Sequence, residues 1–224
     1  MTQIDAARAG IITPQMEVVA AKEHKAPEEI RAGVARGCIA IPANINHKNL
    51  APEGVGEGLR TKVNVNLGIS GDLIDPEVEL EKVRVALELG AEGIMDLSNH
   101  GKTKEFRKKL IEMSPAMIGT VPMYDAIGYL EKPLIGITAQ DFLDVVRAHA
   151  EDGVDFVTIH AGMNRRTIES FKETGRLTNI VSRGGSLIFA WMEATGNENP
   201  FYEHYDEVLE ILHEYDLSLI HISE

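Results

Sequence analysis

The chain has 224 residues, of which 44 % are hydrophobic and 25 % charged, a balance typical of a globular domain with a sizeable core. Its formal net charge of -13 argues against a protein that binds nucleic acid or an anionic membrane surface. A single cysteine, Cys38, excludes an internal disulfide, and no apolar run is long enough to span a bilayer. Because residues 1–10 also lack the apolar core of a signal peptide, we expect a cytoplasmic protein.

Residues 1–61 differ in character from the rest of the chain. Segments 12–23 and 26–37 read as two short helices, and a glycine-rich stretch follows at 52–58. We therefore expect a small N-terminal helical segment that precedes the main domain.

From residue 62 onward, short apolar runs alternate with helix-like segments. The candidate strands are residues 62–68, 93–98, 116–124, 155–162, 179–185 and 216–222. Helix signals between them include Asp75 before Pro76, and a capping box formed by Thr138 and Asp141. Further helices are expected near 103–113 and 202–214. A strand–helix unit about every thirty residues predicts a parallel α/β sheet.

Two α/β architectures compete for this pattern. A doubly wound sheet would normally carry a G-x-G-x-x-G loop after its first strand, but residues 66–76 read NLGISGDLIDP. A (β/α)8 barrel instead spreads its chemistry over the carboxyl ends of many strands. We therefore predict a partial TIM-type barrel over residues 62–216, containing about the first five to six strands of the eight. Residues 217–224 are expected to be a non-native tail.

Polar or soft side chains follow the successive strands, as a barrel site requires. Asn66 could pair with a planar heterocycle, whereas Asn64 is expected on the opposite face. His160 could bond a substrate or shuttle a proton, and its alternative is a structural histidine. Tyr124 could bind a phosphate or stack on a ring, or be a half-buried core aromatic. Met95 alone would be core filler, but Asp96 and Ser98 follow it.

The stretch Ser182-Arg183-Gly184-Gly185 lies between a predicted strand and a predicted helix. A hydroxyl, a guanidinium and bare backbone N–H groups at a helix start form an anion site, and barrels often bind phosphate there. The alternative is a tight turn with a solvated arginine. The barrel context favours the anion site.

Other motifs fail on their spacing. Gly101-Lys102-Thr103 lacks the upstream glycine of a P-loop, since position 96 is Asp. The histidines show no compact metal-ligand spacing, and one cysteine cannot supply a three-cysteine iron–sulfur ligand set.

The motifs as a set closely resemble the phosphomethylpyrimidine synthase family, from about residue 3 to 216. The matching segments, in order, are GIITPQME, IPANINH, VNVNLGIS, IMDLS, MIGTVPMY, DFVTIHAG and LTNIVSRGGS. The resemblance implies a (β/α)8 barrel, a homodimer, and a radical reaction that uses S-adenosylmethionine and a [4Fe–4S] cluster. It implies the conversion of 5-aminoimidazole ribotide to 4-amino-5-hydroxymethyl-2-methylpyrimidine phosphate in thiamine biosynthesis.

By the same resemblance, particular residues receive roles. Asn66, Met95, Tyr124 and His160 occupy substrate-contact positions. Ser182, Arg183 and Gly184 occupy the phosphate-binding stretch.

Departures from the family pattern lie at the carboxyl end. The family's C-x-x-C-x4-C cluster ligands and its metal-binding histidines, for zinc or iron, have no counterpart here, so the resemblance covers the N-terminal half of a member. Residues from about Ile220 onward resemble a translated sequencing adapter. Two alternatives stay open: a 5-hydroxybenzimidazole synthase acting on the same ribotide, and an inert polypeptide that at most binds phosphate ligands.

Overall fold

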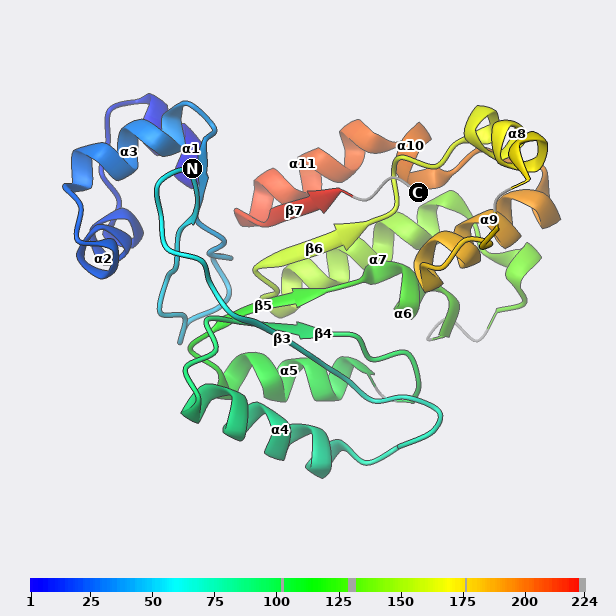
Figure 1. Ribbon diagram of the computed structural model, residues 1–224, viewed down its shortest axis with the longest axis horizontal. Helices are drawn as coiled ribbons and strands as arrows, with labels where there is room; N and C mark the ends of the chain where they lie inside the picture. The colour runs from blue at the N-terminus through cyan, green and yellow to red at the C-terminus, as the bar shows by residue number, and fades with distance from the viewer. Residues whose placement is uncertain (102, 129–131, 176, 222–224) are drawn as a thin grey trace.

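The computed structural model describes residues 1–101, 103–128, 132–175 and 177–221. Within these residues, five parallel strands form a sheet in the order β3-β4-β5-β6-β7, so consecutive strands are neighbours (Figure 1). The strands are β3 Asn64–Leu67, β4 Gly93–Asp96, β5 Met117–Thr120, β6 Phe156–Ile159 and β7 Ser218–His221. A doubly wound sheet would reverse this order at a switch point, whereas a barrel keeps it. The predicted α/β class and partial TIM-type barrel are confirmed.

One set of helices packs along the sheet, and a second set lies beyond the arrowheads of the strands (Figure 1). The helices packed along the sheet are α4 Pro76–Glu88, α5 Thr103–Met113, α7 Ala139–Asp152 and α11 Tyr205–Tyr215. The others are α6 Pro122–Gly128, η1 Leu134–Gly136, α8 Arg165–Thr174, α9 Arg183–Thr195 and α10 Pro200–Glu203. The start of α7 has the predicted capping box, since Thr138 and Asp141 each accept the other's backbone N–H. Asp75 caps α4 by accepting from the N–H of Glu77.

The two faces of the sheet differ in polarity. Ile94, Ile118 and Val157 are fully buried against the helices. The opposite, inner face carries Asn64 and Asn66, whose side chains share a hydrogen bond of 2.9 Å from Nδ2 of Asn64 to Oδ1 of Asn66. The expectation that Asn64 lies on the other face from Asn66 is wrong, because residues two apart in a strand point to the same side.

One predicted strand, at residues 179–185, is absent from the described sheet. Residues 179–182 have no regular structure, and α9 begins at Arg183. Val181 is 81 % exposed, so this short apolar run has no sheet to pack against. The place beside β6 belongs to β7 instead, with Phe156 aligned with Ser218. A brief apolar run bounded by polar residues does not distinguish a buried strand from an extended connection.

The N-terminal segment forms a helical unit with its own core. It contains α1 Gln3–Arg8, α2 Pro14–Glu23 and α3 Pro27–Ala35, followed by an antiparallel pair, β1 Ile39–Ala40 and β2 Val55–Gly56. Its buried side chains are separate from those of the sheet. The sequence predicts α2 and α3 but not α1, which begins with a capping box of Thr2 and Asp5. The unit lies at the end of the sheet opposite the arrowheads (Figure 1).

A buried carboxylate joins the connection after this unit to the sheet. Asp155 precedes β6 and accepts hydrogen bonds from the backbone N–H of Asn44 (3.1 Å) and of Ile118 (2.8 Å). Its Oδ2 also lies 2.7 Å from Nδ1 of His47, whose Nε2 faces the carbonyl of Ser114 at 2.9 Å. Burial opposes a charged imidazole, but these two acceptors raise the pKa of His47 above its ordinary value.

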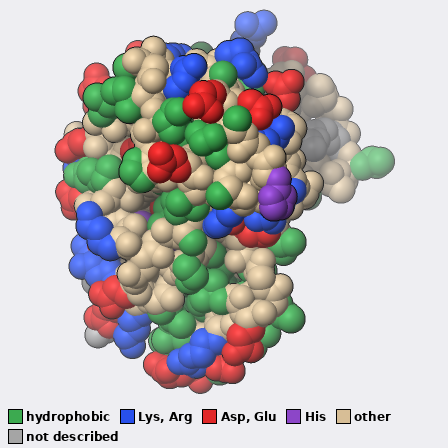
Figure 2. Space-filling view, turned by 90° about the vertical axis from the view of Figure 1, so that its left-hand side faces the viewer, with side chains coloured by type: hydrophobic (Ala, Val, Ile, Leu, Met, Phe, Trp, Pro, Cys, Tyr) green, Lys and Arg blue, Asp and Glu red, His purple; other side chains and the backbone are tan. Residues whose placement is uncertain are grey.

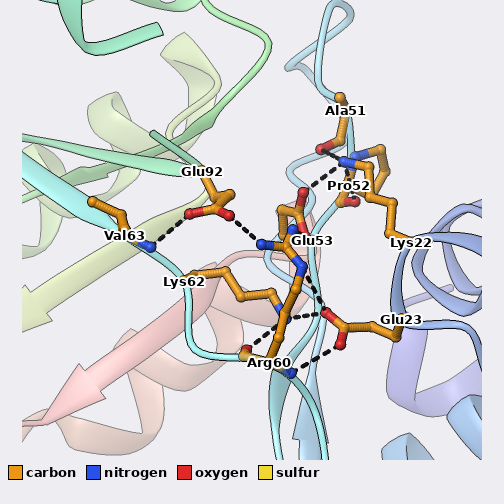
Figure 3. A network of polar contacts seen from close by, with 9 residues as sticks. All are labelled: Lys22, Glu23, Ala51, Pro52, Glu53, Arg60, Lys62, Val63 and Glu92. Carbon is orange, nitrogen blue, oxygen red and sulfur yellow. Dashed lines mark hydrogen bonds and ion pairs between the residues drawn. The ribbon is translucent and has the colours of Figure 1, made fainter. Parts of the chain in front are cut away.

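A second ionic network lies near the surface at the same end (Figure 3). The guanidinium of Arg60 contacts the carboxylates of Glu23 on α2, Glu53 and Glu92. Glu92 precedes β4 and accepts from the N–H of Val63, at 2.6 Å, just before β3. One arginine side chain therefore joins the helical unit to the first two strands of the sheet.

A cavity of about 560 Å³ lies between the β1–β2 pair and the sheet, and it is lined by the first residue of each of the five strands. It is therefore at the amino ends of the strands, away from the face where barrel enzymes hold their active sites. Figure 2 looks onto this end, where acidic and basic side chains are interspersed among hydrophobic ones. None of the helices in the described ranges is long and apolar enough to cross a bilayer.

The Asp155 carboxylate should be the most costly single polar group to alter in this part of the fold. In D155N, an amide NH2 would face N–H donors, and we expect the free energy of unfolding to fall by about 3–5 kcal/mol. Urea denaturation monitored by circular dichroism measures this. E81Q is the matched control because Glu81 pairs with Arg84 on the exposed surface, where such a loss is within about 0.5 kcal/mol. Equal losses for the two variants would contradict the assignment.

Candidate functional site

The ring of His160 meets the start of α9 immediately after β6. His160 is 2 % exposed, and its Nε2 lies 2.9 Å from Oγ of Ser182. The same Oγ accepts the backbone N–H of Gly185 at 3.1 Å, so Ser182 is the N-cap of α9. The hydroxyl thus links the sheet to the first turn of a helix, although residue 182 does not end a strand as predicted.

Gly184 provides the space in which this ring sits. A Cβ built on Gly184 would lie 2.1 Å from Cε1 of His160, far inside van der Waals contact. Any side chain at this position would displace the ring or the helix. The glycine is therefore required by the close approach of α9 to His160.

Arg183, between Ser182 and Gly184, points toward α6. Its guanidinium carbon lies 5.6 Å from the ring centroid of Tyr124, a cation–π distance. Burial raises the pKa of Tyr124, and the charge of Arg183 partly offsets this. Tyr124 belongs to the first turn of α6, because β5 ends at Thr120 rather than continuing to residue 124.

The other two predicted site residues are neighbours of each other on the inner face. Asn66 of β3 is aligned with Met95 of β4, and Asn66 is exposed while Met95 is half-buried. These strands are separated from β6 by β5, so the pair lies across the inner face from His160. The structure thus brings Tyr124, His160 and Ser182-Arg183-Gly184 together at one place, and Asn66 with Met95 at another.

Buried ionic groups support the helix that carries Tyr124. Asp125 receives a hydrogen bond from Nη1 of Arg107 on α5 at 2.7 Å and lies 2.9 Å from Nε2 of His149 on α7. Burial favours the neutral carboxyl, but His149 and Arg107 lower the pKa of Asp125 to about 2. Burial and the charge of Arg107 lower the pKa of His149, so its neutral ring accepts from the hydroxyl of Thr120 through Nδ1. This network fixes α6 against α5 and α7.

Sequence reasoning missed these supporting residues and also Asn199. Asn199 is fully buried, and its side-chain amide donates to the carbonyl oxygens of His160 and Met163, both at 2.7 Å. The only signal available was the Asn-Pro pair that opens α10, which indicates a helix cap and not a contact with residue 160.

A metal site is not found within the described ranges, where no group of three His, Cys, Asp or Glu side chains converges. Cys38 is exposed and lies in the N-terminal unit just before β1. The groups that meet at this site are of the kinds that bind anions in other proteins. The site combines a cationic side chain, a hydroxyl and the first turn of a helix, whose N–H groups lack partners within the helix.

Filling the space at Gly184 should destabilise the protein. In G184A the new methyl group overlaps the His160 ring, and we expect the free energy of unfolding to fall by about 1–3 kcal/mol although alanine favours helix more than glycine does. Urea denaturation measures this. The control is G71A, whose Cβ would meet its nearest neighbour at 3.9 Å. A G184A protein as stable as its parent would contradict the close fit.

The charge state of Asp96 predicts a pH-dependent stability. Burial raises the pKa of Asp96 from 3.8 to about 6, although Ser98 donates to its carboxylate. Between these two values the folded protein holds more protons than the unfolded chain, so stability falls as pH rises. We expect the wild type to lose about 2 kcal/mol relative to D96N between pH 4 and pH 7. Urea denaturation across this range measures it, and parallel curves for the two proteins would disprove it.

Comparison with known proteins places the chain in a family. A model described as the Radical SAM ThiC family matches residues 2–221. Over 218 residues, the chain is 65 % identical to phosphomethylpyrimidine synthase from Alkaliphilus metalliredigens, covering 97 % of this chain and 50 % of that protein. It is 62 % identical to the synthases of Clostridioides difficile and Clostridium tetani, again over 97 % of this chain and over 50 % and 48 % of theirs. The chain spans about half the length of these curated relatives. With a family model that matches nearly every residue, this chain belongs to the radical SAM ThiC family.

Proposed function

We propose that this chain is the part of a phosphomethylpyrimidine synthase that anchors the phosphate of 5-aminoimidazole ribotide. The complete protein converts this ribotide to 4-amino-5-hydroxymethyl-2-methylpyrimidine phosphate in thiamine biosynthesis. The names of the relatives support the reaction, and the meeting of His160 with the first turn of α9 supports the anchor.

The anchor needs a local source of positive potential because the whole chain is acidic, with a net charge of -13. Arg183 supplies a full charge, and the amino end of α9 supplies a partial one. Ser182 adds a hydroxyl that can donate to a phosphate oxygen. These groups lie on three consecutive residues, 182–184, so they bind one phosphate together.

The remaining site residues fit the other end of the ribotide. His160 and Tyr124 flank the anchor, and Asn66 with Met95 lies across the inner face on β3 and β4. An exposed asparagine beside a thioether suits the polar edge and the flat face of an imidazole ring. In the proposal, the ribotide therefore extends from α9 across the inner face toward β3.

The cofactors that the family name implies do not fit this chain. A [4Fe–4S] cluster is held by several cysteine thiolates, and Cys38 stands alone in the N-terminal unit. The ligands for the cluster, for S-adenosylmethionine and for a zinc or iron ion are proposed to lie in the other half of the complete protein. The complete protein is further proposed to be a cytoplasmic homodimer. By itself, the chain binds ribotide without converting it.

Replacing Arg183 tests the anchor. We expect R183A to bind 5-aminoimidazole ribotide at least about tenfold more weakly than wild type in isothermal titration calorimetry, because a charge-assisted contact is lost. The control is R165A: Arg165 is likewise the first residue of its helix, α8, but it pairs with Glu193 on the surface. R165A should bind as wild type does. Equal affinities for R183A and wild type, or no binding by wild type, would overturn the anchor.

The product identifies the reaction of the complete protein. With S-adenosylmethionine, reductant and ribotide, mass spectrometry should find the pyrimidine phosphate. The appearance of 5-hydroxybenzimidazole instead would assign the protein to the paralogous reaction on the same substrate.

A further inference from the structure

The amide side chain of Asn199 forms hydrogen bonds through both its nitrogen and its oxygen. Its Nδ2 donates to the carbonyl oxygens of His160 and Met163, and its Oδ1 accepts the backbone N–H of Phe201 at 3.0 Å. Two donor hydrogens meet two carbonyls, and no atom of Asn199 is exposed. We infer that Asn199 is a positioning residue that sets the place of the His160 ring, an inference that rests on the proposed function.

The turn after β6 depends on these two donations. The sheet ends at Ile159, so the carbonyls of residues 160 and 163 leave the regular ladder while both residues are buried, at 2 % and 5 % exposure. Buried carbonyls need donors, and a lost donor costs the desolvation of the group left unpaired. Asn199 thus holds the 160–163 turn in the conformation that directs His160 toward α9.

The fit of the ring leaves little tolerance for movement of that turn. Nε2 of His160 bonds the hydroxyl of Ser182 on one side, while the backbone of Gly184 lies against the ring. A shift of the turn by one ångström would either break the bond to Ser182 or press the ring into α9. Because Ser182 and Gly184 belong to the proposed phosphate anchor, such a shift also changes the anchor.

Asn199 is itself fixed to the protein core. Phe201, which donates to its Oδ1, is fully buried and packs edge-on against Phe142 of α7, with ring centroids 5.5 Å apart. The backbone carbonyl of Asn199 accepts the N–H groups of Tyr202 and Glu203 in α10. Asn199 therefore connects the tightly packed helices α7 and α10 to the turn that carries His160.

A simpler role for Asn199 would be to cap α10. The oxygen and the nitrogen of its amide allow capping and positioning to be tested separately. Capping uses only Oδ1, and aspartate caps a helix as well as asparagine does. Positioning uses Nδ2, which aspartate lacks. A capping residue would tolerate N199D, whereas a positioning residue would not.

The test measures ribotide affinity by calorimetry together with the imidazole NMR signals of His160, assigned through an H160Q variant. We expect N199D to bind ribotide at least about tenfold more weakly and to show displaced His160 signals in the free protein. The control is N164D, the same substitution at the N-cap of α8, where Asn164 Oδ1 accepts from Thr167 N–H. N164D should match wild type in both measurements.

A second variant keeps the test decisive where N199D fails to fold. N199S retains a capping hydroxyl without a charge but cannot donate to two carbonyls, so it should fold and show the same losses. Wild-type affinity and wild-type His160 signals in a folded N199D or N199S protein would overturn the inference. Absence of ribotide binding by wild type would instead overturn the proposed function, while the displaced His160 signals would still report on the role of Asn199.

Discussion

The contact between the His160 ring and the first turn of α9 is the interaction on which the candidate site depends. It joins a residue that follows a sheet strand to a helix that begins 24 residues after that strand ends, at Ile159. The contact is possible because Gly184 leaves space and Ser182 supplies a hydroxyl that both caps the helix and meets the ring. The position of Arg183 then follows from the helix, since it is the residue between the two. The geometry of the proposed anion anchor is therefore a consequence of how closely α9 approaches His160.

The charged side chains at the two ends of the sheet have different partners. At the amino ends, carboxylates such as Asp155 and Glu92 accept backbone N–H groups and fix the N-terminal unit and its connection to the strands. At the carboxyl ends, the guanidinium of Arg183 lies over the ring of Tyr124. A contact with an aromatic ring uses the face of a guanidinium and not its N–H donors, which can then bind an anion. This difference agrees with the placement of barrel active sites at the carboxyl ends, where loops can vary without loss of the core.

The sequence predicted correctly those features that depend on residues close together in the chain, such as helix caps. The caps of α4 and α7 follow from residues a few positions apart, and the parallel sheet follows from the repeated alternation of strand and helix signals. The predicted strand at 179–185 is wrong because whether an apolar run joins a sheet depends on segments far away in the sequence, and here Val181 stays exposed. The face predicted for Asn64 is wrong for another reason: residues two apart in a strand share a face, and Asn64 bonds Asn66. His160 directly follows β6, as its place at a strand end predicted, whereas Tyr124 lies in α6 and not in the strand predicted for it. Asn199 could not be found in this way, since the carbonyls it bonds lie 36 and 39 residues away.

The proposed phosphate anchor would contribute to the reaction even though the single cysteine of this chain cannot hold an iron–sulfur cluster. Binding energy from a part of the substrate that does not react can position the reacting atoms, and it is available wherever the phosphate is held rigidly. The buried polar groups around the site hold its side chains in place. Asp125 and His149 fix α6 beneath Tyr124, and Asn199 fixes the turn that carries His160. Each acts on the site through backbone or helix placement, without itself lining the inner face. The residues of the proposed anchor and the groups that support them all lie between β4 and α10 in the sequence.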